Sequence, residues 1–223
     1  MGILKLMDAA EQPQSGLSAP RRIELLQQAV RMDPSNPLLY HSLGAKLEKS
    51  GRFDDAMKLY RAALKNGVDN GRLRSRLGDL LVRAGKKAEA IPEYEQSVRM
   101  NPADVATEAN LATAYLELGR LADAERVLKG IVAIEPSNAA AQNGLGVLEI
   151  QRNNGTAARG YFEKAVELDP DLVEAYLNLG LLYKMVGDNA HARASFEQFL
   201  AKAPPRQYQA EIPKVREALG ELK

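Results

Sequence analysis

Large apolar residues, small residues and polar residues follow one another along this chain in a pattern that returns every 34 residues. A leucine comes back at that interval without slippage, a small residue follows it directly, and an alanine stands twelve positions further on. A fixed period of this length indicates a stack of similar supersecondary units, each burying its apolar face against its neighbours. The three positions hold Leu43, Leu77, Leu111, Leu145 and Leu179; Gly44, Gly78, Ala112, Gly146 and Gly180; and Ala56, Ala90, Ala124, Ala158 and Ala192.

Each unit is predicted to contain two helices, because helix start and stop signals recur within it. Asn36 and Pro37 form one start, a capping side chain followed by proline at the first helical position. Gly51 closes the first helix of that unit, since glycine adopts the left-handed conformation found at helix ends. The same position later holds Gly85, Gly119, Asn153 and Gly187, and the second helices end near Pro34, Pro102, Pro136, Pro170 and Pro204.

The unit at residues 37–70 carries Tyr40, Leu43, Gly44, Leu47, Ala56, Tyr60 and Ala63. This order resembles the tetratricopeptide repeat (TPR) family, and the resemblance covers nearly all of the chain. In that family, small residues let the two helices of a unit approach closely and large neighbours fill the flanking space. The resemblance implies an all-α fold, a right-handed α-solenoid of antiparallel helix pairs with a C-terminal capping helix.

The ends of the chain depart from the regular unit, as terminal repeats do. Residues 1–36 form a degenerate N-terminal repeat with a long loop, and residues 207–223 carry an apolar stripe that is typical of a capping helix. Between them we expect five units, at 37–70, 71–104, 105–138, 139–172 and 173–206.

The charge balance and the absence of cysteine narrow the classes of partner and site. Thirty basic and 29 acidic side chains give a net charge of +1, which disfavours nucleic acid or an anionic membrane as the main partner. Without cysteine there is no disulfide and no thiolate metal site. The N-terminus lacks a signal-peptide pattern, and no apolar run approaches the roughly 20 residues of a membrane span. We therefore expect a soluble protein, cytoplasmic by default.

Catalytic chemistry is not indicated anywhere in the sequence. The two histidines, His41 and His191, have no second ligand at metal-binding spacing. No nucleophile elbow, phosphate loop or kinase signature occurs. The sequence therefore predicts no enzyme activity, no cofactor and no metal site. His41 falls on the face that lines the concave groove in TPR proteins, where it is either a contact residue or a solvated one.

The same groove face carries a basic group in the unit at 71–104. Arg72, Arg76 and Arg83 recur at helical spacing and share one side of the first helix. They form either a solvated face in which Asp79 pairs with Arg76 and Arg83, or a guanidinium cluster that binds a carboxylate or phosphate.

Later units are expected to present an apolar stretch with amides beside it. Two interpretations of this apolar stretch remain open. Either its residues line a peptide site, or Leu177 and Leu181 pack into a neighbouring unit or under the C-terminal helix. The Lys-containing clamp of chaperone-binding TPR proteins is absent, so we do not expect chaperone-tail binding. The groove candidates are Asn110, Asn143, Val147, Ile150, Leu177, Asn178 and Leu181.

These features predict a non-catalytic interaction scaffold that binds a partner peptide or protein segment in the concave groove. Two alternatives remain open: a self-associating assembly module, and an accessory TPR region of a larger, possibly enzymatic protein. A helical-repeat RNA reader is disfavoured, because only one unit has a basic groove face.

Overall fold

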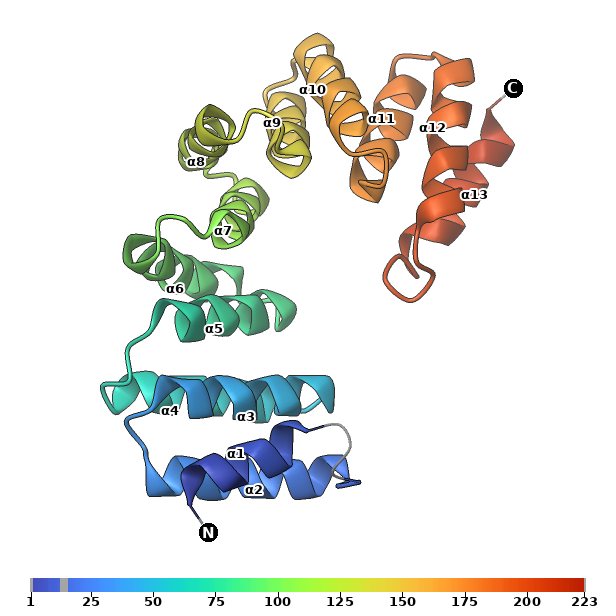
Figure 1. Cartoon of the computed structure of the whole chain (residues 1–223). Coiled ribbons are helices and arrows are strands. Elements are labelled where there is room, and N and C mark those ends of the chain that lie inside the picture. Colours follow the sequence, from blue (N-terminus) through green and yellow to red (C-terminus); the bar gives the residue numbers. More distant parts are fainter. Residues whose placement is uncertain (1, 13–15, 223) are drawn as a thin grey trace. The chain divides into compact units, whose positions relative to one another are not determined.

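The computed structural model describes residues 2–12 and 16–222, and the regular elements within them are α-helices without any strand (Figure 1). The expected all-α fold of stacked helix pairs is therefore confirmed. In chain order the helices are α1 (Ile3–Glu11), α2 (Ala19–Met32), α3 (Pro37–Lys49), α4 (Phe53–Lys65), α5 (Gly71–Arg83), α6 (Lys87–Met100), α7 (Val105–Glu117), α8 (Leu121–Ile134), α9 (Ala139–Gln151), α10 (Gly155–Leu168), α11 (Val173–Met185), α12 (Asn189–Lys202) and α13 (Glu211–Glu221).

The helix ends follow the local signals in the sequence. The Asn36 side chain accepts a hydrogen bond from the Leu38 backbone N–H and so caps α3. At the close of the first helices, Gly51 has φ +72° and Asn153 has φ +58°, both in the left-handed region. Such residues end a helix because the next N–H groups can turn back to its last carbonyls. The predicted two-helix unit is thus built from short-range interactions.

The chain divides into two compact units, Met1–Ala114 and Tyr115–Lys223, with the boundary inside α7. In the N-terminal unit, each helix from α1 to α6 packs on the next, and α3 also touches α5 directly. In the C-terminal unit, the helices from α8 to α13 pack in the same sequential way. Neighbour-on-neighbour packing of this kind is how repeat proteins bury a continuous core.

The two helices of a repeat cross at a glycine that lies against an aromatic ring. A Cβ atom added to Gly146 would come within 2.4 Å of the Phe162 ring, and one added to Gly78 within 2.5 Å of the Tyr94 ring. The same contact occurs between Gly44 and Tyr60 and between Gly180 and Phe196. Glycine is therefore required in these four repeats, because no side chain fits between the helices there, whereas the repeat at 105–138 has Ala112 at this position.

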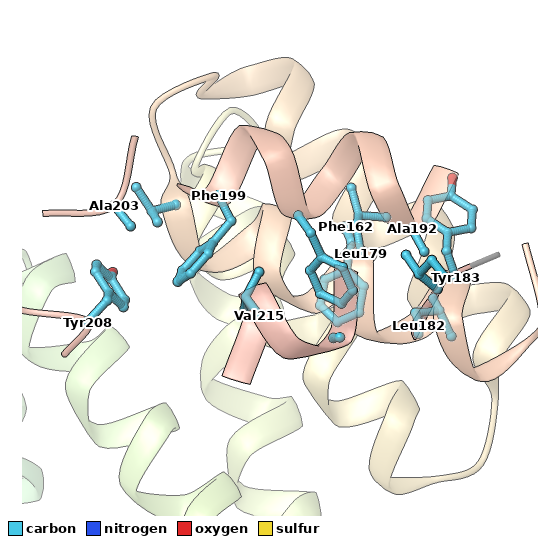
Figure 2. Packing of buried hydrophobic residues seen from close by; sticks show 14 residues of the cluster. Phe162, Leu179, Leu182, Tyr183, Ala192, Phe199, Ala203, Tyr208 and Val215 are labelled. Atoms are coloured by element: carbon cyan, nitrogen blue, oxygen red, sulfur yellow. The ribbon is translucent and has the colours of Figure 1, made fainter. Parts of the chain in front are cut away.

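The last helix covers the end of the C-terminal unit. Val215 of α13 belongs to one buried cluster with Phe199 and Tyr208, whose rings meet edge to face with centroids 5.4 Å apart (Figure 2). An ion pair of 2.6 Å joins Lys184 to Glu221 at the rim of this contact. The helix α13 thus buries apolar side chains that the preceding repeat would otherwise expose.

We predict that Gly146→Ala lowers the free energy of unfolding by about 1–3 kcal/mol, because the new Cβ would overlap the fully buried Phe162 ring. The matched control is Gly160→Ala, which also lies inside a helix but has no atom within 4 Å of the added Cβ. This control should be neutral or stabilising by up to about 1 kcal/mol. Urea denaturation of both variants measures the difference, and equal effects would contradict the crossing described above.

Candidate functional site

The candidate site is the exposed side of the first helix of each repeat, which we call the first-helix face. In the N-terminal unit it lies on α3, α5 and the start of α7, and in the C-terminal unit on α9 and α11. All of the sequence-predicted groove residues lie on these helices. The two units present different chemistry, so each is described separately.

In the N-terminal unit, the first-helix face is a chain of polar contacts that begins at Glu48. The buried Tyr60 hydroxyl donates to Glu48 Oε1 at 2.9 Å. The Arg76 guanidinium lies 3.8 Å from the Glu48 carboxylate and 3.8 Å from the Asp79 carboxylate. Burial, together with the nearby Glu48 carboxylate, raises the pKa of Tyr60, so this hydroxyl stays protonated and acts as a donor.

Asp79 extends this series of polar contacts into the next repeat. Its Oδ1 accepts hydrogen bonds from the Tyr94 hydroxyl at 2.9 Å and from Asn110 Nδ2 at 3.0 Å. Burial raises the pKa of Asp79, although Tyr94, Arg76 and Asn110 each oppose that shift. Asn110 was predicted as a groove amide, and in the structure it is exposed and donates to Asp79.

The three predicted arginines separate into two groups. Arg72 and Arg76 both act electrostatically on His41 of α3, whose pKa is lowered first by burial and then by these two guanidinium groups. Arg83 instead stacks over the Phe53 ring, 3.7 Å from its centroid. The expected pairing of Asp79 holds for Arg76 alone among the described residues.

In the C-terminal unit, the first-helix face is apolar and hollowed. A cavity of about 160 Å³ opens between α9, α10 and α11. Leu181 and Met185 at its mouth are 52% and 68% exposed. The cavity is lined by Val147, Ile150, Phe162, Asn178, Leu181, Leu182 and Met185.

Of the two roles predicted for these leucines, packing into the core applies to Leu177 and exposure at a peptide site applies to Leu181. Leu177 is partly buried and packs against the core cluster of this unit, whereas Leu181 stays exposed at the cavity. Beside it, Asn178 Nδ2 donates to Asn143 Oδ1 at 2.9 Å, so the two predicted amides are brought together. Val147 and Ile150 lie on the cavity wall, as a groove role requires.

The aromatic residue of the second helix explains the difference between the units. Tyr60 and Tyr94 carry hydroxyls that need acceptors, and Glu48 and Asp79 supply them. Phe162 carries no hydroxyl, and Val147 and Ile150 line the cavity with it. Phe162 was absent from the predicted site, although the change from tyrosine to phenylalanine at one repeat position is visible in the sequence.

Neither a cluster of metal ligands nor a membrane-spanning helix is found in the described part of the chain. Across residues 2–12 and 16–222, no three His, Asp or Glu side chains gather in a way that could hold a metal ion. None of the helices in these ranges combines the length and apolarity needed to cross a bilayer.

Two family models, both described as tetratricopeptide repeat, match the sequence. One matches at residues 23–69, 41–105 and 109–173, and the other at residues 161–194. No curated protein was found to match.

Several solved structures share the fold. A tetratricopeptide repeat protein from Parabacteroides merdae is 23% identical, with a TM-score of 0.81 over 98% of this chain and 87% of that chain. PilW, described as a widely conserved type IV pilus biogenesis factor, is 20% identical, with a TM-score of 0.73 over 96% and 98%. YrrB, described as a TPR protein with an unusual peptide-binding site, is 22% identical, with a TM-score of 0.68 over 78% and 90%.

We predict that Glu48→Ala lowers the free energy of unfolding by about 1–3 kcal/mol, since the buried Tyr60 hydroxyl loses its acceptor. Combining it with Tyr60→Phe should restore most of that loss, because no polar group is then left buried. Urea denaturation of the two single variants and the double variant measures this coupling. Strictly additive losses would show that the hydroxyl and the carboxylate do not depend on one another.

Proposed function

Because this chain belongs to the tetratricopeptide repeat family, we propose that it is a non-catalytic scaffold that binds a segment of a partner protein on its first-helix face. Proteins of this family generally act as interaction scaffolds. One protein of similar fold is described as having a peptide-binding site, which supports the same kind of role here.

The observation that carries this proposal is the open apolar cavity of the C-terminal unit. Leu181 and Met185 are large apolar side chains left in contact with solvent beside a hollow of about 160 Å³. Covering them would remove apolar surface from water, at about 25 cal/mol per Å². The volume is close to the roughly 150 Å³ of cavities that accept benzene. The occupant we propose is therefore one aromatic or branched apolar side chain of the bound segment.

The amide pair at the cavity supplies a polar complement to that side chain. The bond between Asn178 and Asn143 uses one N–H and one carbonyl oxygen. Each amide side chain carries two N–H donors and one acceptor, so both retain capacity for the backbone of a bound segment. A few polar groups around an apolar hollow are typical of sites that fix the orientation of a ligand.

Two alternatives stand beside this proposal. In the first, a second copy of the chain covers the cavity. In the second, the chain is an accessory region of a larger, possibly enzymatic protein. Size-exclusion chromatography with light scattering separates a self-associating protein from a monomer. Removal of the apolar side chain at the cavity mouth would abolish such self-association if the cavity mediates it.

We predict that Leu181→Asp weakens binding of a cognate segment at least tenfold, mainly through faster dissociation, because a carboxylate would face the apolar side chain at the cavity mouth. Peptides selected on the immobilised protein provide the ligand, and surface plasmon resonance gives the rates. Leu181 is half exposed, so the substitution leaves the core intact.

The matched control is Ile134→Asp, in which an apolar side chain that is 73% exposed at the end of a second helix receives the same charge. This control should bind the selected peptides as the parent protein does. If Ile134→Asp abolished binding while Leu181→Asp left it unchanged, the first-helix face would be the wrong surface.

A further inference from the structure

A second feature of the first-helix face lies in the N-terminal unit, where α3 and α5 touch directly. Arg72 of α5 is exposed, and its guanidinium forms no ion pair with any described residue. Arg76 on the same helix lies 3.8 Å from Glu48 and from Asp79, which is beyond hydrogen-bond distance. Both guanidinium groups therefore keep their donors available to an incoming anion.

His41 of α3 adds a titratable group to this pair of arginines. Its side chain is only partly buried, but its Nδ1 is fully buried and has no hydrogen-bond partner. Burial, followed by Arg72 and Arg76, lowers the pKa of His41 below its ordinary value of 6.5. Near neutral pH the imidazole is therefore mostly uncharged, because burial and two guanidinium groups disfavour its protonated form.

The helices α1, α2 and α4 supply the other charged and titratable groups around α3. From α1, Glu11 opposes the lowered pKa, and that carboxylate is itself paired with Lys46 at 3.0 Å. From α4, the Tyr60 hydroxyl is bound to Glu48. On α2, Arg21 pairs with Glu24, and Arg22 donates to the carbonyls of Ala10 and Leu17.

We propose that His41, Arg72 and Arg76 form an anion-binding subsite that holds a carboxylate of the partner protein, and that His41 takes up one proton from solvent as this carboxylate binds. The proposal rests on the proposed function, in which partner proteins bind the first-helix face. A bound carboxylate offsets the repulsion from the two guanidinium groups, so the imidazolium becomes the favoured form. A charge-assisted hydrogen bond to the carboxylate then holds the proton in place.

A monoanion suits this subsite better than a phosphate dianion. Glu48 and Asp79 each lie 3.8 Å from Arg76, and Glu11 acts on His41 from α1. A second negative charge on the ligand would be repelled by all three carboxylates, whereas a single carboxylate is matched by Arg72 and the imidazolium. The occupant is therefore assigned as an aspartate or glutamate side chain.

The pH dependence has a defined sign. In the free protein the pKa of His41 is lowered, and in the complex the carboxylate raises it. The anion therefore binds most tightly below the free-state pKa, its affinity falls as the pH rises from the free-state to the bound-state pKa, and above the bound-state pKa the affinity is constant. Uptake of one proton limits the change to about tenfold per pH unit.

Nuclear magnetic resonance can follow this directly, because the chain contains only two histidines. The probe is a single glutamate residue with an acetylated N-terminus and an amidated C-terminus, so that it carries one carboxylate. We expect the titration midpoint of His41 to rise when the probe is present, while that of His191, which is 66% exposed and paired with Asp188, stays unchanged. An unmoved His41, or equal shifts of both histidines, would overturn the proposal.

Three variants sharpen the test. Arg72→Gln should raise the midpoint of free His41, because a repelling charge is removed, and should weaken probe binding at least fivefold. Its control is Arg83→Gln, which removes an exposed guanidinium of the same helix that stacks on Phe53, and probe binding should persist. His41→Gln should leave binding nearly independent of pH between 5 and 7.5. Equal weakening by Arg72→Gln and Arg83→Gln would reduce the site to general charge attraction and overturn the assignment.

Two further measurements separate this proposal from its alternatives. Inorganic sulfate, which is a dianion over this whole pH range, should move His41 less than the probe does at the same concentration, and a larger shift would overturn the carboxylate assignment. Leu181→Asp should leave the response of His41 to the probe intact, because the two features lie in different units. If His41 responds to the probe while Leu181→Asp has no effect on the binding of selected peptides, the apolar cavity is not the peptide site and the anion-binding subsite is supported. If Leu181→Asp weakens peptide binding while His41 does not respond to the probe, only the subsite is overturned.

Discussion

The structure depends on the close crossing of two helices at a glycine that lies against an aromatic ring. At Gly44, Gly78, Gly146 and Gly180, the space that a Cβ would occupy is already filled by the ring of the following helix. Interiors packed at crystal-like density cannot absorb such an overlap without moving a buried side chain or the backbone. The contact therefore fixes the distance between the helices of a repeat, and with it the positions of the residues that the first helix exposes.

The same contact decides the chemistry of the exposed face. A tyrosine ring at the crossing, as at Tyr60 or Tyr94, brings its hydroxyl toward the first helix, where a buried donor needs an acceptor. Carboxylates then occupy the face, and they in turn attract an arginine. A phenylalanine such as Phe162 makes no such demand, so aliphatic side chains line the face and leave an apolar hollow. The presence or absence of a hydroxyl group on the aromatic ring at the crossing thus decides whether the exposed face is charged or apolar.

The similar solved structures establish the fold of this chain rather than its chemistry. Their identities of 20–23% leave the exposed positions unconstrained, while the crossing positions and helix caps are enough to produce the same repeat. In repeat proteins the exposed residues of each unit are free to vary because the core is carried by the repeated ones. The face of this chain, with His41 beside two arginines in one unit and an apolar cavity in the other, has to be interpreted from its own residues.

The sequence alone determined the period, the helix pairs and the ends of the helices, because each follows from interactions within a few residues. Asn36 caps its own helix, and Asn153 adopts a positive φ where the other repeats use glycine. The roles of the exposed side chains required the tertiary structure. Arg83 turns to Phe53, and Asn110 is held by Asp79 from the preceding repeat. These partners lie about 30 residues apart in the chain, where helical spacing carries no information about which of several neighbours a long polar side chain will contact.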